Sequence, residues 1–160
     1  MSKIFINGVA RDMSHLDPFQ MKADIDGQAV TLNFTFFNHC FTDEKGDIPM
    51  CFKNEERYWS EDRYRDSLNL RTLLEKNFLS HYAVVYLSKK QAEQYHVMEI
   101  HDYAIFFDIN KPSGTSNTLK IKIISAYTVD PWGKHALPKG TPKKVRWILS
   151  MRLKGLSALK

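Results

Sequence analysis

Two stretches of this chain, residues 103–109 and 119–127, carry apolar side chains at nearly every second position. Successive side chains of a strand point to opposite faces, so this alternation is typical of strands that bury only one face. Residues 110–117 between them are rich in Pro, Gly, Ser, Thr and Asn, which favour turns. The pattern predicts a long β-hairpin whose second strand places its odd-numbered residues, Tyr127 among them, on the buried face.

A third stretch, residues 144–154, shows the same alternation and is predicted to be a strand of the same sheet. Its even-numbered positions are mostly basic, as are two of those in residues 119–127. A sheet that buries one face can present a polar second face to solvent. We therefore expect a basic, nucleic-acid-binding face on this sheet. It consists of Lys120, Lys122, Lys144, Arg146 and Arg152.

Residues 60–78 contain the clearest helical pattern. Ser60 is placed to cap a helix, and acidic residues follow in the first turn, where the helix dipole favours negative charge. Apolar residues then recur at helical spacing, and they are Leu70, Leu73, Leu74 and Phe78. The pattern predicts one principal helix that covers the apolar face of the sheet.

The first third of the chain is predicted to hold strands and a loop. Residues 1–37 indicate an N-terminal β-meander, in which the Asp-Gly pair at 26 and 27 supplies the backbone angles of a tight hairpin turn. Periodicity then stops, and Gly and Pro interrupt the pattern. We expect residues 38–59 to form a loop.

Residues 81–87 are predicted to form a strand, and residues 88–93 a short helical turn. Together with the helix and the hairpin, these elements predict an α+β fold, a mostly antiparallel sheet with one principal helix packed on it. A length of 160 residues is typical of one domain. We expect a single domain over 1–160, with the helix and antiparallel sheet at 60–154.

The charge of the chain is unevenly distributed. Residues 1–110 carry 12 Lys and Arg against 17 Asp and Glu, a balance of −5, whereas residues 111–160 carry 11 against one, a balance of +10. Such asymmetry indicates a polyanionic partner, because Lys and Arg that neutralise phosphates dominate nucleic-acid binding. We expect a nucleic acid as the partner, with RNA favoured over DNA. A solvated surface balanced by the acidic part of the chain is the alternative.

No apolar run reaches the length of a membrane-spanning helix, and the first residues lack a long apolar segment. We therefore expect a cytoplasmic protein with no membrane partner. The chain contains two cysteines, Cys40 and Cys51. In a reducing compartment they are expected to be free thiols. They also do not match the spacing of a zinc site, even with the adjacent His39. We expect no metal and no cofactor.

The chain lacks the glycine-rich, nucleophile-elbow and HExxH motifs of nucleotide-driven, α/β-hydrolase and zinc-protease chemistry. It retains His, Tyr and Arg residues near a basic sheet. Metal-independent ribonucleases use such groups as general base, general acid and phosphorane stabiliser. The candidate catalytic residues are His39, Arg63, His81 and Tyr127. Each is also compatible with an ordinary structural role, and aromatic residues beside basic ones can stack bases without catalysis.

Several short pieces of the chain carry a resemblance to known families. The segments NHCFT, EDRYRDSLNL, HYAVVYL, YAIFFDI and ISAYTVD are similar to a small bacterial domain family, over about residues 34–150. The order of helix, strands and late basic segment also resembles the barnase, EndoU, colicin and RelE-like ribonuclease group. That second resemblance implies an RNA-cleaving toxin, prophage or antiphage-defence protein.

Three functional hypotheses follow from these patterns. The first is a metal-independent endoribonuclease. The second is an RNA- or DNA-binding module without catalysis. The third is a protein that binds a protein partner, such as an antitoxin or a subunit, through its oppositely charged parts.

Overall fold

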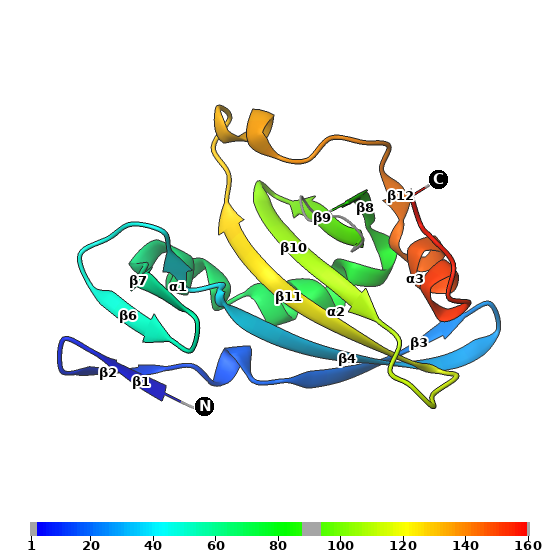
Figure 1. Cartoon of the computed structure of the whole chain (residues 1–160), viewed down its shortest axis with the longest axis horizontal. Helices are drawn as coiled ribbons and strands as arrows, with labels where there is room; N and C mark the ends of the chain where they lie inside the picture. The colour runs from blue at the N-terminus through cyan, green and yellow to red at the C-terminus, as the bar shows by residue number, and fades with distance from the viewer. Residues whose placement is uncertain (1–2, 88–93, 160) are drawn as a thin grey trace.

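The computed structural model describes residues 3–87 and 94–159 of the chain. The largest sheet formed by these residues has the strand order β12-β8-β9-β10-β11-β4-β3 (Figure 1). Every neighbouring pair is antiparallel except β11 and β4, which are parallel. The strands are β3 (Phe19–Ile25), β4 (Gln28–His39), β8 (Tyr82–Leu87), β9 (Gln94–Ile100), β10 (Tyr103–Asn110), β11 (Thr118–Thr128) and β12 (Lys143–Lys144). The predicted α+β fold with a mostly antiparallel sheet is confirmed.

The predicted long hairpin is formed by β10 and β11, but its register contains one irregularity. Phe106 pairs with Ser125 and Phe107 pairs with Ile123, so Ile124 is an extra residue on β11. A bulge of this kind exchanges the faces of all residues beyond it. Ala126 is therefore buried in the main core, and the prediction that Tyr127 faces that core is wrong. Alternation in the sequence cannot reveal an inserted residue.

The segment predicted as one helix over 60–78 forms α1 (Glu61–Ser67), α2 (Leu70–Asn77) and the short η2 (Phe78–Ser80). Ser60 caps α1 as predicted, because its side chain accepts a hydrogen bond from the Arg63 backbone N–H at 3.1 Å. The break follows Ser67, whose hydroxyl donates to the Tyr64 carbonyl at 2.7 Å. Such bonds compete with the backbone ladder and bend helices.

The stretch 144–154 is not the predicted strand but the helix α3 (Val145–Leu153). Its buried residues follow helical spacing, because Val145, Ile148 and Leu149 are inaccessible whereas Trp147 is 37% exposed. The apolar residues at odd positions therefore do not share one face. Alternation over nine residues also fits part of a helical pattern. The segment forms a helix because α3 then completes the core beside α2.

The main core lies between the sheet and the two helices α2 and α3 (Figure 1). Phe34 of β4 and Phe107 of β10 both contact Phe78 edge to face, with ring centroids 5.2 and 5.3 Å apart respectively. The three rings are inaccessible to solvent. This packing joins η2 to two separate strands and fixes which face of the sheet is covered.

The segments before α1 differ from the prediction. The expected meander consists of two hairpins in different sheets, β1 (Lys3–Ile6) with β2 (Val9–Asp12), and β3 with β4, joined through η1 (Ser14–Leu16). The expected loop at 38–59 contains a second sheet of β5 (Thr42–Asp43), β6 (Pro49–Phe52) and β7 (Glu55–Trp59). These strands are too short for periodicity to reveal them.

Other predictions in this part of the chain are confirmed or remain untested. The Asp26 and Gly27 turn is confirmed, with φ of 54° and 80°. The helical turn expected at 88–93 lies outside the described residues. The last short helical turn, η3 (Gly133–Ala136), belongs to the segment between β11 and β12. No helix within 3–87 or 94–159 is long and apolar enough to cross a bilayer.

The second face of the sheet is covered only in part. Over β9 and β10, Leu137 from the segment after β11 packs against a buried cluster of Val97, Ala104 and Val129, as do Phe106 and Tyr127. Helices α2 and α3 lie against the other face. The side chains of β3, β4 and β11 that point away from the main core form what we call the open face. Its members include Lys22, Phe37, Lys120 and Lys122. Tyr127 lies at its end, where it packs on the covered part of this face.

His96 on β9 gives this core a dependence on pH. The imidazole is fully buried, stacks on Phe107 with centroids 4.8 Å apart, and has Nδ1 3.0 Å from the Phe107 carbonyl oxygen. Burial lowers the pKa of His96 to about 4, and the positive charge of Arg152 acts in the same direction. Because the folded pKa lies below the unfolded value near 6.5, stability is lost as pH falls from 6.5 toward 4.

We predict that His96→Asn changes this dependence. Asn retains an N–H donor near the Nδ1 position but does not titrate. Between pH 7 and pH 4.5 the wild type should lose about 2 kcal/mol more unfolding free energy than the variant, since the unfolded chain binds the proton more tightly. Urea unfolding at both pH values measures this. A difference between the two proteins that stays constant with pH would contradict the assignment.

Candidate functional site

Arg63 on α1 is the residue around which the candidate site is built. Its Nη1 donates to the carbonyl oxygens of His39 at 3.1 Å and Thr42 at 2.7 Å. Its Nη2 lies 3.6 Å from an oxygen of Asp43, and its side chain is 17% exposed. The guanidinium therefore ties the end of β4 and the start of β5 to the first turn of α1, which the Ser60 cap holds in place.

Tyr127 lies directly beside Arg63. The guanidinium carbon is 4.7 Å from the Tyr127 ring centroid, within the range of a cation–π interaction. The other neighbour of the ring is Phe106, which stacks at 5.7 Å with 22° between the planes. Burial raises the pKa of Tyr127, although Arg63 acts against the shift. The phenol is therefore neutral at physiological pH and can donate a hydrogen bond.

Arg63 and Tyr127 line a polar cavity of about 520 Å³. Its wall contains hydroxyl and carboxylate groups. One hydroxyl is hydrogen-bonded to a carboxylate within the wall, because Thr128 Oγ1 donates to Asp66 at 2.7 Å. The other lining residues are Asp43, Ser60, Asp62, Asp66 and Thr128. The carboxylates outnumber the single guanidinium, so this cavity suits hydroxyl and N–H donors better than phosphate groups.

The two histidines of the predicted catalytic set lie in different places. His39 Nε2 is 2.9 Å from Oε1 of Glu55, and this hydrogen bond is the main cause that lowers the pKa of Glu55. His81 Nε2 lies 2.9 Å from the carbonyl oxygen of Glu99, beside β8. Because β8 is three strand positions from β11, His81 is roughly 14 Å from the strand of Tyr127. The structure gathers His39, Arg63 and Tyr127 at one end of the sheet but not His81.

The predicted basic face is divided between two layers. Lys120 and Lys122 lie on the open face, where Lys122 Nζ is 4.0 Å from the Phe37 ring centroid. Arg146 and Arg152 are on α3 and donate to the carbonyls of Asp24 at 2.7 Å and Ile109 at 3.0 Å. Lys144 immediately precedes α3. The expectation of one face is wrong because it required residues 144–154 to be a strand.

Sequence reasoning missed three residues that belong to this region. Phe37 is 45% exposed on β4 and Phe106 packs on Tyr127, while Glu55 holds His39. An aromatic residue at an outward position of a strand was the available signal for Phe37. No sequence signal places Glu55, because it reaches His39 through the unpredicted hairpin of β6 and β7.

The cysteines are free thiols, as predicted. Cys40 is buried in the main core, and burial raises its pKa to about 12, so it stays protonated. Cys51 is exposed on β6. Within the described part of the chain, no three His, Cys, Asp or Glu side chains are grouped closely enough to hold a metal ion.

Comparison with known proteins gives one match. The model of the YjaZ family matches residues 3–153, so the chain belongs to this family. Neither the curated proteins nor the solved structures contain a match. The expected relationship to a domain family is confirmed, whereas the resemblance to the ribonuclease group finds no support in these comparisons.

We predict that Arg63→Ala lowers the unfolding free energy by about 1–3 kcal/mol, because it leaves two carbonyl oxygens without their charged donor. Arg65 on the same helix is the matched control. Its side chain is 65% exposed and lies 3.5 Å from the Asp62 carboxylate, so Arg65→Ala should cost less than about 0.5 kcal/mol. Urea unfolding of both variants tests this, and equal losses would contradict the role given to Arg63.

Proposed function

We propose that this member of the YjaZ family holds a single strand of nucleic acid, RNA before DNA, across the open face of its sheet. The observation that carries the proposal is the proximity of aromatic and basic side chains on the side of β4 and β11 opposite α2 and α3, with α1 at the end of β11. Lys122 lies over Phe37, and Arg63 lies over Tyr127. Aromatic rings stack bases and neighbouring cations attract phosphates, which together are the usual means of binding single strands.

The surroundings of Phe37 favour the insertion of a base. A hollow of about 340 Å³ opens beside this ring, between the end of β4 and the tip of the β6–β7 hairpin. Phe52 forms a second aromatic wall, and Lys53 and Asn54 provide polar groups at the tip. A base stacked on Phe37 would have room here, with its phosphate toward Lys122.

Neighbouring carboxylates determine which cationic side chains can attract the nucleic-acid strand. Arg63 is close to the Asp43 carboxylate, so its charge is largely compensated. Lys120 and Lys122 on β11, with Lys22 on β3, are the remaining cations of the open face. Binding should therefore depend on a few phosphate contacts along β11 and should weaken moderately with salt.

The distribution of charge along the chain supports the same partner. The last fifty residues supply both lysines of β11 and carry a balance of +10. The acidic excess of residues 1–110 supplies Asp43 and Glu55, which lie near the basic groups. A nucleic-acid strand bound along β11 would contact the lysines in the middle of the strand and lie near the carboxylates at the end of the sheet.

A second candidate function is metal-independent cleavage of the bound RNA. The observation that favours it is the His39–Glu55 pair, in which an ionised carboxylate orients an imidazole. His39 would take the proton of a ribose 2′-hydroxyl, whose oxygen attacks the adjacent phosphorus and displaces the 5′-oxygen. The products would be a 2′,3′-cyclic phosphate and a 5′-hydroxyl end. Tyr127 is a neutral phenol that can protonate the leaving oxygen.

We predict that Lys120→Gln with Lys122→Gln weakens the binding of a labelled single-stranded RNA and reduces the salt slope by about 1.4, or about 0.7 for each phosphate that is no longer neutralised. Fluorescence anisotropy across a salt series measures both. The matched control is Lys144→Gln with Arg146→Gln, which removes the same charge from the start of α3. That control should retain the wild-type slope.

Equal losses in the two double variants would contradict a specific role for the open face. No salt-sensitive binding by the wild type would overturn the proposal and favour a protein partner. The same RNA incubated with EDTA and analysed for cyclic-phosphate ends tests the second candidate. Cleavage that His39→Ala abolishes, with RNA binding retained, would support it, and intact RNA would leave binding alone.

A further inference from the structure

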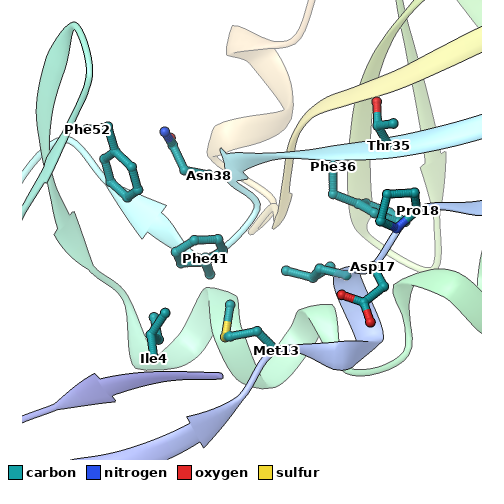
Figure 2. A pocket seen from close by; sticks show the side chains of 10 residues that line it. Ile4, Met13, Asp17, Pro18, Thr35, Phe36, Asn38, Phe41 and Phe52 are labelled. Carbon is teal, nitrogen blue, oxygen red and sulfur yellow. The ribbon is translucent and has the colours of Figure 1, made fainter. Parts of the chain in front are cut away.

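A cavity of about 300 Å³ lies where the N-terminal hairpin, the end of β4 and the second sheet meet (Figure 2). Its described wall contains three aromatic rings, those of Phe36, Phe41 and Phe52, and four further apolar side chains. Its size is at the lower end of the range for small-molecule sites, which are also mostly apolar. The cavity is therefore a candidate ligand site separate from the polar cavity at Arg63.

The cavity arises because β3 and β4 have unequal lengths. Their pairing ends where Phe19 faces Phe34, but β4 continues to His39. The chain before Phe19 turns away at Pro18 into η1 instead of continuing along β4. The space that a longer β3 would occupy is therefore left between the two segments, and it is part of the fold.

The cavity lies between two apolar clusters of the protein. Phe36 packs against the main core, whereas Met13 and Phe41 belong to a smaller cluster around Trp59. Leu16 of η1 packs against both clusters. A ligand in the cavity would add apolar contacts to each cluster and would stabilise the folded protein against unfolding.

The polar residues of the wall provide no free charge for a ligand. Asp17, the one charged residue among the described lining residues, already has an interaction partner within the protein. Asn38 is a hydrogen-bond partner of Glu55. Thr35 and Phe36 point to opposite sides of β4, so the Thr35 side chain is directed to the open face (Figure 2). The wall therefore suits an uncharged ligand.

The aromatic part of the wall favours an aromatic ligand. The rings of Phe41 and Phe52 have centroids 6.4 Å apart and 65° between their planes. A flat ligand can therefore lie parallel to one ring and place its edge against the other, which are the two arrangements that aromatic pairs prefer. An apolar cavity of about 150 Å³ holds one benzene molecule. The volume of about 300 Å³ is thus large enough for two fused rings.

We infer that this cavity binds an uncharged aromatic compound of two fused rings. The ligand packs against Phe36, Phe41 and Phe52, and burial of its apolar area supplies the affinity. A charged group on the same rings lowers the affinity, because the wall offers no free counter-ion and an unpaired charge is costly to bury. An alkyl chain of similar volume binds less tightly, because it makes no ring–ring contacts and loses more conformational freedom.

This inference is independent of the proposed function. It uses no lysine of the open face and neither Arg63 nor Tyr127. The cavity shares Asn38 and Phe52 with the hollow beside Phe37, but the variants below change neither residue. Failure of RNA binding would leave the inference intact, and its own failure would leave the nucleic-acid proposal intact.

The test is a titration of the whole protein with naphthalene, followed by ¹H–¹⁵N NMR. Naphthalene should give saturable shifts in the backbone signals of residues 13–17 and 35–41, and it should raise the melting temperature. Benzene should bind about fivefold more weakly, because it buries less apolar area. The anion 2-naphthoate, which has the same rings, should bind at least about tenfold more weakly. For 1-octanol, an alkyl chain of similar volume, we expect a loss of about threefold or more.

Two variants locate the site. Leu16→Trp should fill the cavity and remove naphthalene binding. Leu87→Trp makes the same exchange at an exposed position of β8 and is the matched control, so it should retain the wild-type affinity. If Leu16→Trp does not fold, Phe41→Leu decides, because it keeps an apolar side chain but removes one ring of the wall. Phe41→Leu should weaken naphthalene binding about fivefold.

Any of four results would overturn the inference. The first is the absence of saturable shifts with naphthalene in the folded protein. The second is equal affinity for naphthalene and 2-naphthoate, and the third is 1-octanol binding as tight as that of naphthalene. The fourth is full naphthalene affinity in folded Leu16→Trp or, where that variant does not fold, in Phe41→Leu.

Discussion

The packing of η2 and α2 against a single face of the sheet is the constraint on which the rest of the molecule depends. Phe78 contacts both Phe34 and Phe107, which belong to different strands of the sheet. Because successive side chains of a strand point to opposite faces, packing of one face of β4 and β11 on the helices directs their alternate side chains away from the helices. The lysines of β11 and Phe37 reach solvent for this reason.

The bulge at Ile124 couples this packing to the candidate site. Without the extra residue, Tyr127 would point into the core and Ala126 would lie on the open face. With it, the Tyr127 ring comes under the guanidinium of Arg63. Bulges are common next to functional sites because they redirect a side chain without disturbing the strands on either side. One inserted residue thus determines which aromatic group the end of the open face presents.

Sequence reasoning predicted the elements whose patterns are long and regular. The hairpin of β10 and β11 and the Ser60 cap followed from periodicity and capping chemistry, and both are confirmed. The prediction of a strand at 144–154 was wrong because nine alternating residues fit a strand and a helix equally well, and only packing distinguishes the two. The parallel pairing of β11 with β4 and the contact of Glu55 with His39 join distant parts of the chain. Local patterns carry no information on such contacts.

Photo-crosslinking tests most directly whether a single strand of nucleic acid lies across the open face. An RNA that contains 4-thiouridine would be irradiated with the whole protein, and the crosslinked peptides would be identified by mass spectrometry. We expect crosslinks to Phe37 on β4 and Tyr127 on β11, and unlabelled RNA should compete with them. Crosslinks confined to α3, or the absence of competition at both aromatic residues, would contradict the claim.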